Sequence, residues 1–109
     1  MLKLYIKTSK LYAEANYFGG KIEILAGSFV KKEISPSFPK SMIEKRNNLI
    51  KEGIIKDNNQ NYFFTKNYAC KSASEASNII TGTASNGMLY WKTKEGKTLG
   101  WIIKNNEDE

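Results

Sequence analysis

PKSMIEKRNNLIKEG, residues 39–53, carries the clearest structural signal in the chain. Pro39 suits the first turn of a helix, with Ser37 or Phe38 before it as the cap, and Gly53 suits a left-handed helix end. At about 100° per residue, one side of this helix carries the apolar side chains and the other side is charged or polar. The apolar stripe consists of Met42, Ile43, Leu49 and Ile50. The pattern predicts an amphipathic helix over about residues 39–52.

The residues before this helix have the two-residue period of strands. Leu2, Leu4 and Ile6 alternate with polar or amphipathic residues, which predicts a strand over 2–8 with one buried face. Residues 9–20 are less regular and fit either a second short strand or a loop, closed by a Gly-Gly turn. Strands are also predicted over 21–26 and 29–34, with a bend at Gly27-Ser28 between them.

The residues after the helix predict two hairpins separated by a second helix. The first hairpin spans 53–65, with a polar loop over 57–61. Ser72 and Glu75 form a capping-box pattern, so a short helix is expected over 73–81. Asn86-Gly87 signals a turn, and residues 88–93 and 98–103 are expected to pair as a C-terminal hairpin. On its paired strands Trp91 and Trp101 could form a cross-strand aromatic pair, although packing in the core or at its rim is the default for both.

These elements together predict an α+β fold. It would contain a small antiparallel sheet, one long amphipathic helix, one short helix and the C-terminal β-hairpin. The length of 109 residues, with 40% hydrophobic and 26% charged residues, suits a single domain, expected over 1–104. The remaining residues, 105–109, are expected to form an acidic flexible tail.

Composition argues against several classes of function. The sequence contains no histidine, which excludes imidazole-based catalysis and makes most zinc sites unavailable. Cys70 is the single cysteine, so the chain has no internal disulfide, which suits the cytoplasm. Scattered glutamates give no paired-carboxylate spacing. We therefore expect a protein that is not an enzyme, with no cofactor and no metal site, and no apolar run is long enough for a membrane span.

The charge balance points to an acidic partner. The formal net charge is +6, and all of this excess lies in residues 1–56, which hold eleven basic and five acidic side chains. Residues 57–109 hold six of each. A basic excess of this kind favours nucleic acid or another anionic surface as the partner.

The order and spacing of several short stretches resemble one known family. The stretches are 24–28 (ILAGS), 38–41 (FPKS), 46–55 (RNNLIKEGII), 72–82 (SASEASNIITG), 85–87 (SNG), 91–92 (WK) and 96–99 (GKTL). Their arrangement is similar to domain-of-unknown-function family 4357, which is found appended to GIY-YIG nuclease-type proteins and near restriction-modification systems. The resemblance covers nearly the whole chain and implies that context, with a nuclease or methyltransferase domain in the same or another chain as a partner. The GIY-YIG motifs themselves do not occur in this sequence.

Lysines next to aromatic residues are the candidate nucleic-acid contacts. Lys3, Tyr5 and Lys7 share one face of the first predicted strand, where cations could hold phosphates and the ring could stack on a base, and Lys10 follows shortly after this strand. The other candidate lysines are Lys31 and Lys32 beyond the strands, and Lys40, Lys45 and Lys51 on the outer side of the long helix. Each group also fits an ordinary solvated face.

Three further residues complete the candidate set. Arg46 lies within the apolar stripe, where its guanidinium needs backbone carbonyls, an acid such as Glu75, or a phosphate. Asn86 and Lys92 could form an anion cradle at the predicted turn, or simply a hairpin turn beside a core tryptophan. The sequence thus predicts a monomeric, non-catalytic accessory domain that binds DNA through phosphates. The alternative is a protein-interaction or structural module that binds no nucleic acid.

Overall fold

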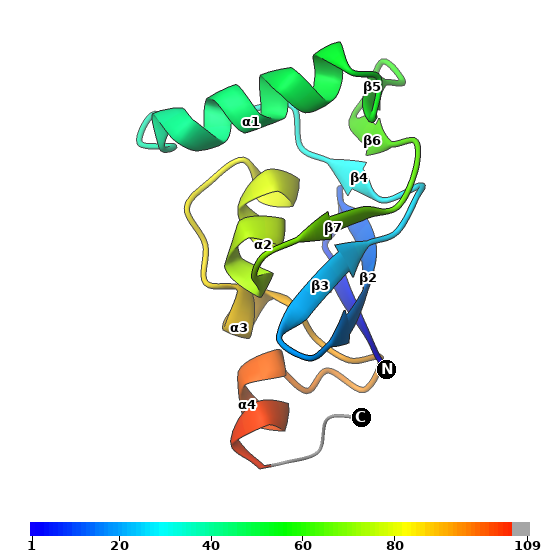
Figure 1. Cartoon of the computed structure of the whole chain (residues 1–109), viewed down its shortest axis with the longest axis vertical. Helices are drawn as coiled ribbons and strands as arrows, with labels where there is room; N and C mark the ends of the chain where they lie inside the picture. The colour runs from blue at the N-terminus through cyan, green and yellow to red at the C-terminus, as the bar shows by residue number, and fades with distance from the viewer. Residues whose placement is uncertain (106–109) are drawn as a thin grey trace.

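The structure, a computed structural model, describes residues 1–105 (Figure 1). These residues form two antiparallel sheets and four helices. The mixed α and β composition with antiparallel sheets agrees with the prediction. The strands form two sheets and not one small sheet, and of the C-terminal hairpin only the turn and a single bridge between Lys92 and Thr98 are present. Of the predicted acidic tail, all but Asn105 lies outside the described residues.

The first sheet has the strand order β1-β2-β3-β7. Its strands are β1 (Leu2–Lys7), β2 (Tyr12–Phe18), β3 (Lys21–Ile24) and β7 (Tyr68–Cys70). Alternate side chains are buried along each strand, as the two-residue period predicts. Leu4, Ala13, Ala15 and Ile24 are fully buried on the inner face, whereas Lys3, Tyr5 and Lys7 lie on the outer face. The irregular stretch 9–20 therefore contains a regular strand.

The second sheet has the strand order β4-β6-β5. Its strands are β4 (Phe29–Val30), β6 (Tyr62–Phe64) and β5 (Ile55–Asp57). Gly27, with a φ of 90°, bends the chain out of the first sheet. The predicted strand 29–34 stops at Val30 because the next backbone amide, that of Lys31, donates to the carbonyl of Ile80 over 2.9 Å. The chain leaves the sheet here to follow the end of a helix.

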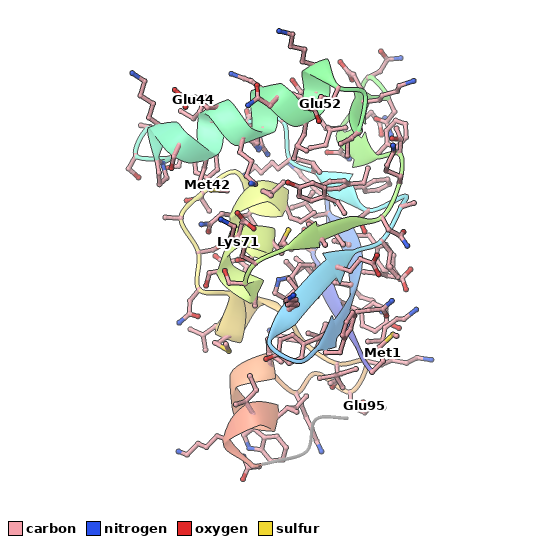
Figure 2. All side chains as sticks on the ribbon, in the orientation of Figure 1. Met1, Met42, Glu44, Glu52, Lys71 and Glu95 are labelled. Carbon is pink, nitrogen blue, oxygen red and sulfur yellow. The ribbon has the colours of Figure 1, made fainter. Side chains whose placement is uncertain are left out.

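Helix α1 (Lys40–Lys51) confirms the predicted amphipathic helix and lies across one end of the molecule (Figure 1). It ends in a Schellman motif, in which the amides of Gly53 and Ile54 donate to the carbonyls of Ile50 and Leu49. Figure 2 shows Met42 on the side of α1 that faces the rest of the fold and Glu44 on the outer side.

Helix α2 (Ala73–Thr81) occupies the predicted residues and packs against both sheets. Ser72 Oγ accepts the amide of Glu75 over 3.1 Å, as the capping box requires. The Glu75 carboxylate accepts the amide of Lys71 over 2.8 Å, one residue earlier than predicted. Ala76, Ile79 and Ile80 are fully buried, so α2 forms the centre of the core.

The predicted C-terminal hairpin is replaced by two short helices, α3 (Gly87–Tyr90) and α4 (Leu99–Lys104). Asn86 and Thr98 cap them, with side-chain oxygens that accept the amides of Met88 and Trp101. Leu99 and Ile102, one helical turn apart, are buried by α4. Helix α4 forms instead of a strand because a helix places Leu99 and Ile102, three residues apart, on the same buried face. A strand would place these two side chains on opposite faces of the sheet.

The two tryptophans do not form a cross-strand pair, and Trp91 takes the core packing that was its default. Trp91 is fully buried, and its indole Nε1 donates to the carbonyl of Ala73 over 3.0 Å. Trp101 lies on α4 and is 42% exposed. Between the helices only isolated bridges remain, joining Lys92 to Tyr5 and to Thr98. None of the helices in the described part of the chain has the length and apolarity needed to cross a bilayer.

Candidate nucleic-acid interface

Two adjoining clefts lie between the first strand, the start of the second sheet and the segment that follows α3. Their volumes are about 450 Å³ and 540 Å³, and Thr8 and Tyr90 line both of them. Three lysines line each cleft, and Glu33 is the acidic residue in their combined lining. We call the two clefts together the basic groove. Its lysines are Lys7, Lys92 and Lys94 in the first cleft and Lys10, Lys31 and Lys32 in the second.

The first cleft is built by backbone pairing between β1 and the segment after α3. The amide of Tyr5 donates to the carbonyl of Lys92 over 2.7 Å, and the amide of Lys92 donates back over 3.0 Å. Residues directly opposite each other in such a bridge project their side chains to the same side. Lys92 therefore joins Tyr5 and Lys7 on one face, and Lys7 Nζ lies 4.8 Å from the centre of the Tyr5 ring.

The second cleft is built where the chain leaves β4 and runs along the end of α2. Lys31 is exposed there, and its backbone is held by the hydrogen bond to Ile80. Lys32 is partly neutralised, because its Nζ lies 2.7 Å from Asp57 Oδ1 and also donates to the carbonyl of Asn59 over 3.2 Å. The hydrogen bond from Lys32 lowers the pKa of the Asp57 carboxyl. Lys10 and Lys31 therefore supply more available charge than Lys32.

Arg46 anchors the backbone beneath this cleft. Its side chain is buried, and its guanidinium donates to the carbonyl of Ile79 through Nε at 3.2 Å and Nη2 at 3.1 Å. It also donates to the carbonyls of Lys31 and, over 3.5 Å, Lys32. Burial lowers the pKa of this guanidinium. The sequence left backbone carbonyls, an acid such as Glu75 and a phosphate open as partners of Arg46, and in the structure its partners are backbone carbonyls. The carbonyl of Ile79 lies at the carboxyl end of α2, where the helix dipole favours a cation.

Gly82 allows the 31–35 segment and the Arg46 guanidinium to lie close to the end of α2. Its φ of 73° ends α2 in the left-handed conformation, and a Cβ at this position would overlap the carbonyl oxygen of Glu33 and press against Arg46. The glycine thus allows the 31–35 segment to lie against the end of α2. This contact fixes one wall of the second cleft.

The remaining predicted lysines lie outside the groove. Lys3 is on the outer face of β1, 3.8 Å from Glu14, and Lys45 on α1 is 3.3 Å from Glu75. Lys40 and Lys51 are exposed on α1 and line neither cleft. The structure brings Lys7, Lys31, Lys32 and Lys92 of the predicted set together with Tyr5. Asn86 is occupied as the cap of α3 and lines neither cleft.

Sequence reasoning did not single out Tyr90 and Lys94. The run Tyr90-Trp91-Lys92 interleaves a cation with aromatic residues, which is the signal that could have found Tyr90. The predicted hairpin places Tyr90 in its first strand and Lys94 in its turn, and it does not indicate that either residue lies beside Thr8. The short helix α3 is what moves Tyr90 to the junction of the two clefts.

Cys70 is buried on the inner face of β7. Burial, together with the charge of Glu75, raises the pKa of its thiol to about 12. The thiol is therefore protonated at neutral pH, and a protonated thiol is a poor nucleophile.

Comparison with known proteins identifies a family but no characterised relative. No curated protein and no solved structure matches the chain. A family model described as a domain of unknown function matches residues 4–102, a range that includes every residue of both clefts. The chain therefore belongs to the domain-of-unknown-function family DUF4357.

Proposed function

We propose that this domain is a non-catalytic accessory module that binds DNA through its phosphates. The observation that carries the proposal is the basic groove, in which six lysines and one glutamate line two adjoining clefts. Lysine ammonium groups bind phosphates as point charges and release condensed counterions, which supplies affinity with little sequence preference. In a nuclease or restriction-modification context, such a module holds DNA for a nuclease or methyltransferase domain in the same or another chain. It would act as a cytoplasmic monomer.

Charge reversal tests whether the groove is the binding surface. Replacing Lys92 and Lys94 by glutamate reverses two charges in the first cleft. Replacing Lys40 and Lys51 by glutamate changes the net charge equally on α1, whose lysines were also candidate contacts. We expect the groove variant to lose binding to a fluorescein-labelled DNA strand at about 50 mM salt, and the α1 variant to retain most of it.

The result that contradicts this assignment is equal loss in the two variants, which would show that only net charge matters. Binding that is lost in the α1 variant alone would move the interface to that helix. Circular dichroism spectra of both variants establish that the fold is retained, because all four lysines are exposed.

Exposed apolar side chains on the short helices favour a second candidate function, a protein-interaction module. Leu89 on α3 is 59% exposed and Trp101 on α4 is 42% exposed, with Met88 and Ile103 also exposed. Apolar groups gathered on neighbouring elements are typical of contact surfaces. Under this alternative the wild-type protein binds no DNA, and replacing Trp101 and Ile103, which line neither cleft, by serine abolishes binding to the protein partner.

A further inference from the structure

Tyr90 occupies the junction of the two clefts. It is the last residue of α3, it is 42% exposed, and it lines both clefts together with Thr8. Tyr90 therefore lies between Lys7, Lys92 and Lys94 in one cleft and Lys10 and Lys31 in the other. An aromatic ring between two groups of cations is the arrangement by which proteins hold a strand with its bases unstacked.

The backbone around Tyr90 is held in place before any ligand arrives. Its amide donates to the carbonyl of Asn86 over 3.0 Å, which closes the single turn of α3. The next residue, Trp91, is fully buried, and its indole is bonded to the carbonyl of Ala73. Gly87, at the other end of α3, touches the backbone of Ala73 so closely that no Cβ would fit. An exposed ring on a fixed backbone loses little conformational entropy when a base stacks on it.

A double helix cannot use this ring, because its base faces are covered by neighbouring bases and only base edges are accessible in its grooves. Each cleft has the volume of a small-ligand pocket, so each is large enough for about one nucleotide. We infer that the basic groove takes single-stranded nucleic acid, with one base stacked on Tyr90 and the flanking phosphates held by the lysines of the two clefts. This inference rests on the proposed function and specifies its ligand.

Fluorescence anisotropy with four labelled probes of equal length tests the inference. The probes are an oligothymidylate, the same phosphodiester strand without bases, an oligouridylate and a DNA duplex. The abasic strand carries the same charge as the oligothymidylate, so the ratio of the two affinities isolates the contribution of the bases. DNA and RNA share the base face and the phosphate, and the oligouridylate shows whether the groove prefers one sugar.

Three variants accompany the wild-type protein. Tyr90→Ala should weaken oligothymidylate binding by about 5- to 100-fold, the range that loss of one stacked base produces. Tyr90→Phe retains the aromatic face and should bind as the wild type does. Phe18→Ala is the matched control, since Phe18 is also exposed, at 46%, but lies at the far end of β2. None of the variants should change the affinity for the abasic strand.

The outcomes separate the inference from the proposed function. If oligothymidylate, abasic strand and duplex bind with equal affinity, and Tyr90→Ala changes none of them, the phosphate proposal stands and the stacking inference is wrong. If no probe binds at about 50 mM salt, both are wrong. A loss in Tyr90→Ala that is confined to the strands with bases, and rescued in Tyr90→Phe, supports the inference.

Discussion

The buried guanidinium of Arg46 joins the end of α2 to the segment that follows β4. Its guanidinium holds the carbonyls of Ile79, Lys31 and Lys32, and Phe38 lies against it with 5.8 Å between the guanidinium carbon and the ring centre. Arg46→Met keeps most of the apolar volume but leaves these carbonyls without their donor. We expect a loss of about 2–4 kcal/mol in the free energy of unfolding, measured by urea denaturation, because buried unpaired polar groups are costly.

The control for this variant is Lys40→Met on the exposed side of α1, which should change stability by less than about 0.5 kcal/mol. If Arg46→Met were as stable as the wild type but bound DNA less well, the guanidinium would be a ligand contact and not a backbone anchor.

The thiol of Cys70 makes stability depend on pH in the alkaline range. Its pKa is raised in the folded protein from an ordinary value of 9.0 to about 12. Between these values the unfolded chain has lost the proton and the folded chain keeps it, so the free energy of unfolding falls as pH rises. Below pH 9 both states are protonated and this contribution to stability is fully present.

Comparison with Cys70→Ala isolates this effect from the titration of lysines. The loss of stability between about pH 9 and pH 12 should be smaller in the alanine variant than in the wild type, as measured by urea denaturation at each pH. If the free energy of unfolding fell equally with pH in the two proteins, the Cys70 thiol would have the same pKa in the folded and the unfolded chain, which would contradict the prediction.

At the scale of elements, the contact between α2 and α3 sets the position of the groove. Gly87 is buried at the start of α3, and a Cβ there would overlap the carbonyl carbon and oxygen of Ala73. The overlap involves backbone on both sides, so neither helix can relieve it by a rotamer change. Gly87→Ala should cost about 3 kcal/mol of stability, near the upper end of the usual overpacking penalty, as measured by thermal unfolding.

Gly96→Ala is the comparison for that variant. Gly96 has a φ of 91° and open space around its Cα, so its substitution carries only the left-handed backbone cost of about 1–2 kcal/mol. Similar losses in the two variants would show that α3 shifts away from α2 without penalty.

At the scale of the whole molecule, the distribution of charge predicts a steep salt dependence. The groove gathers lysines from β1 and the turn after it, from the 31–32 segment and from the segment after α3, and Lys32 is already paired with Asp57. With five lysines neutralising phosphates, single-strand affinity should fall on the order of 100-fold between about 50 and 200 mM salt. Anisotropy titrations at several salt concentrations measure the slope, and affinity independent of salt would exclude binding through phosphates.

Elements whose signals are local could be predicted from the amino-acid sequence. The helices 40–51 and 73–81 follow from an apolar stripe, a capping box and terminal glycines, all within a few residues of one another. The strands 2–7 and 21–24 follow in the same way from alternation. The need of Arg46 for a buried partner was also readable, because a cation within an apolar stripe must be compensated.

The C-terminal region and the groove could not be predicted in this way, because both depend on long-range packing. Asn86-Gly87 and Thr98 fit a hairpin as well as helix caps, and the choice depended on Trp91 reaching Ala73 and on Leu99 and Ile102 being buried. The basic groove joins residues from three distant parts of the chain, near positions 5–10, 31–33 and 89–96. Local pattern carries no information on which exposed side chains meet, because that depends on how the sheets and helices pack, and packing is settled by contacts between residues far apart in sequence.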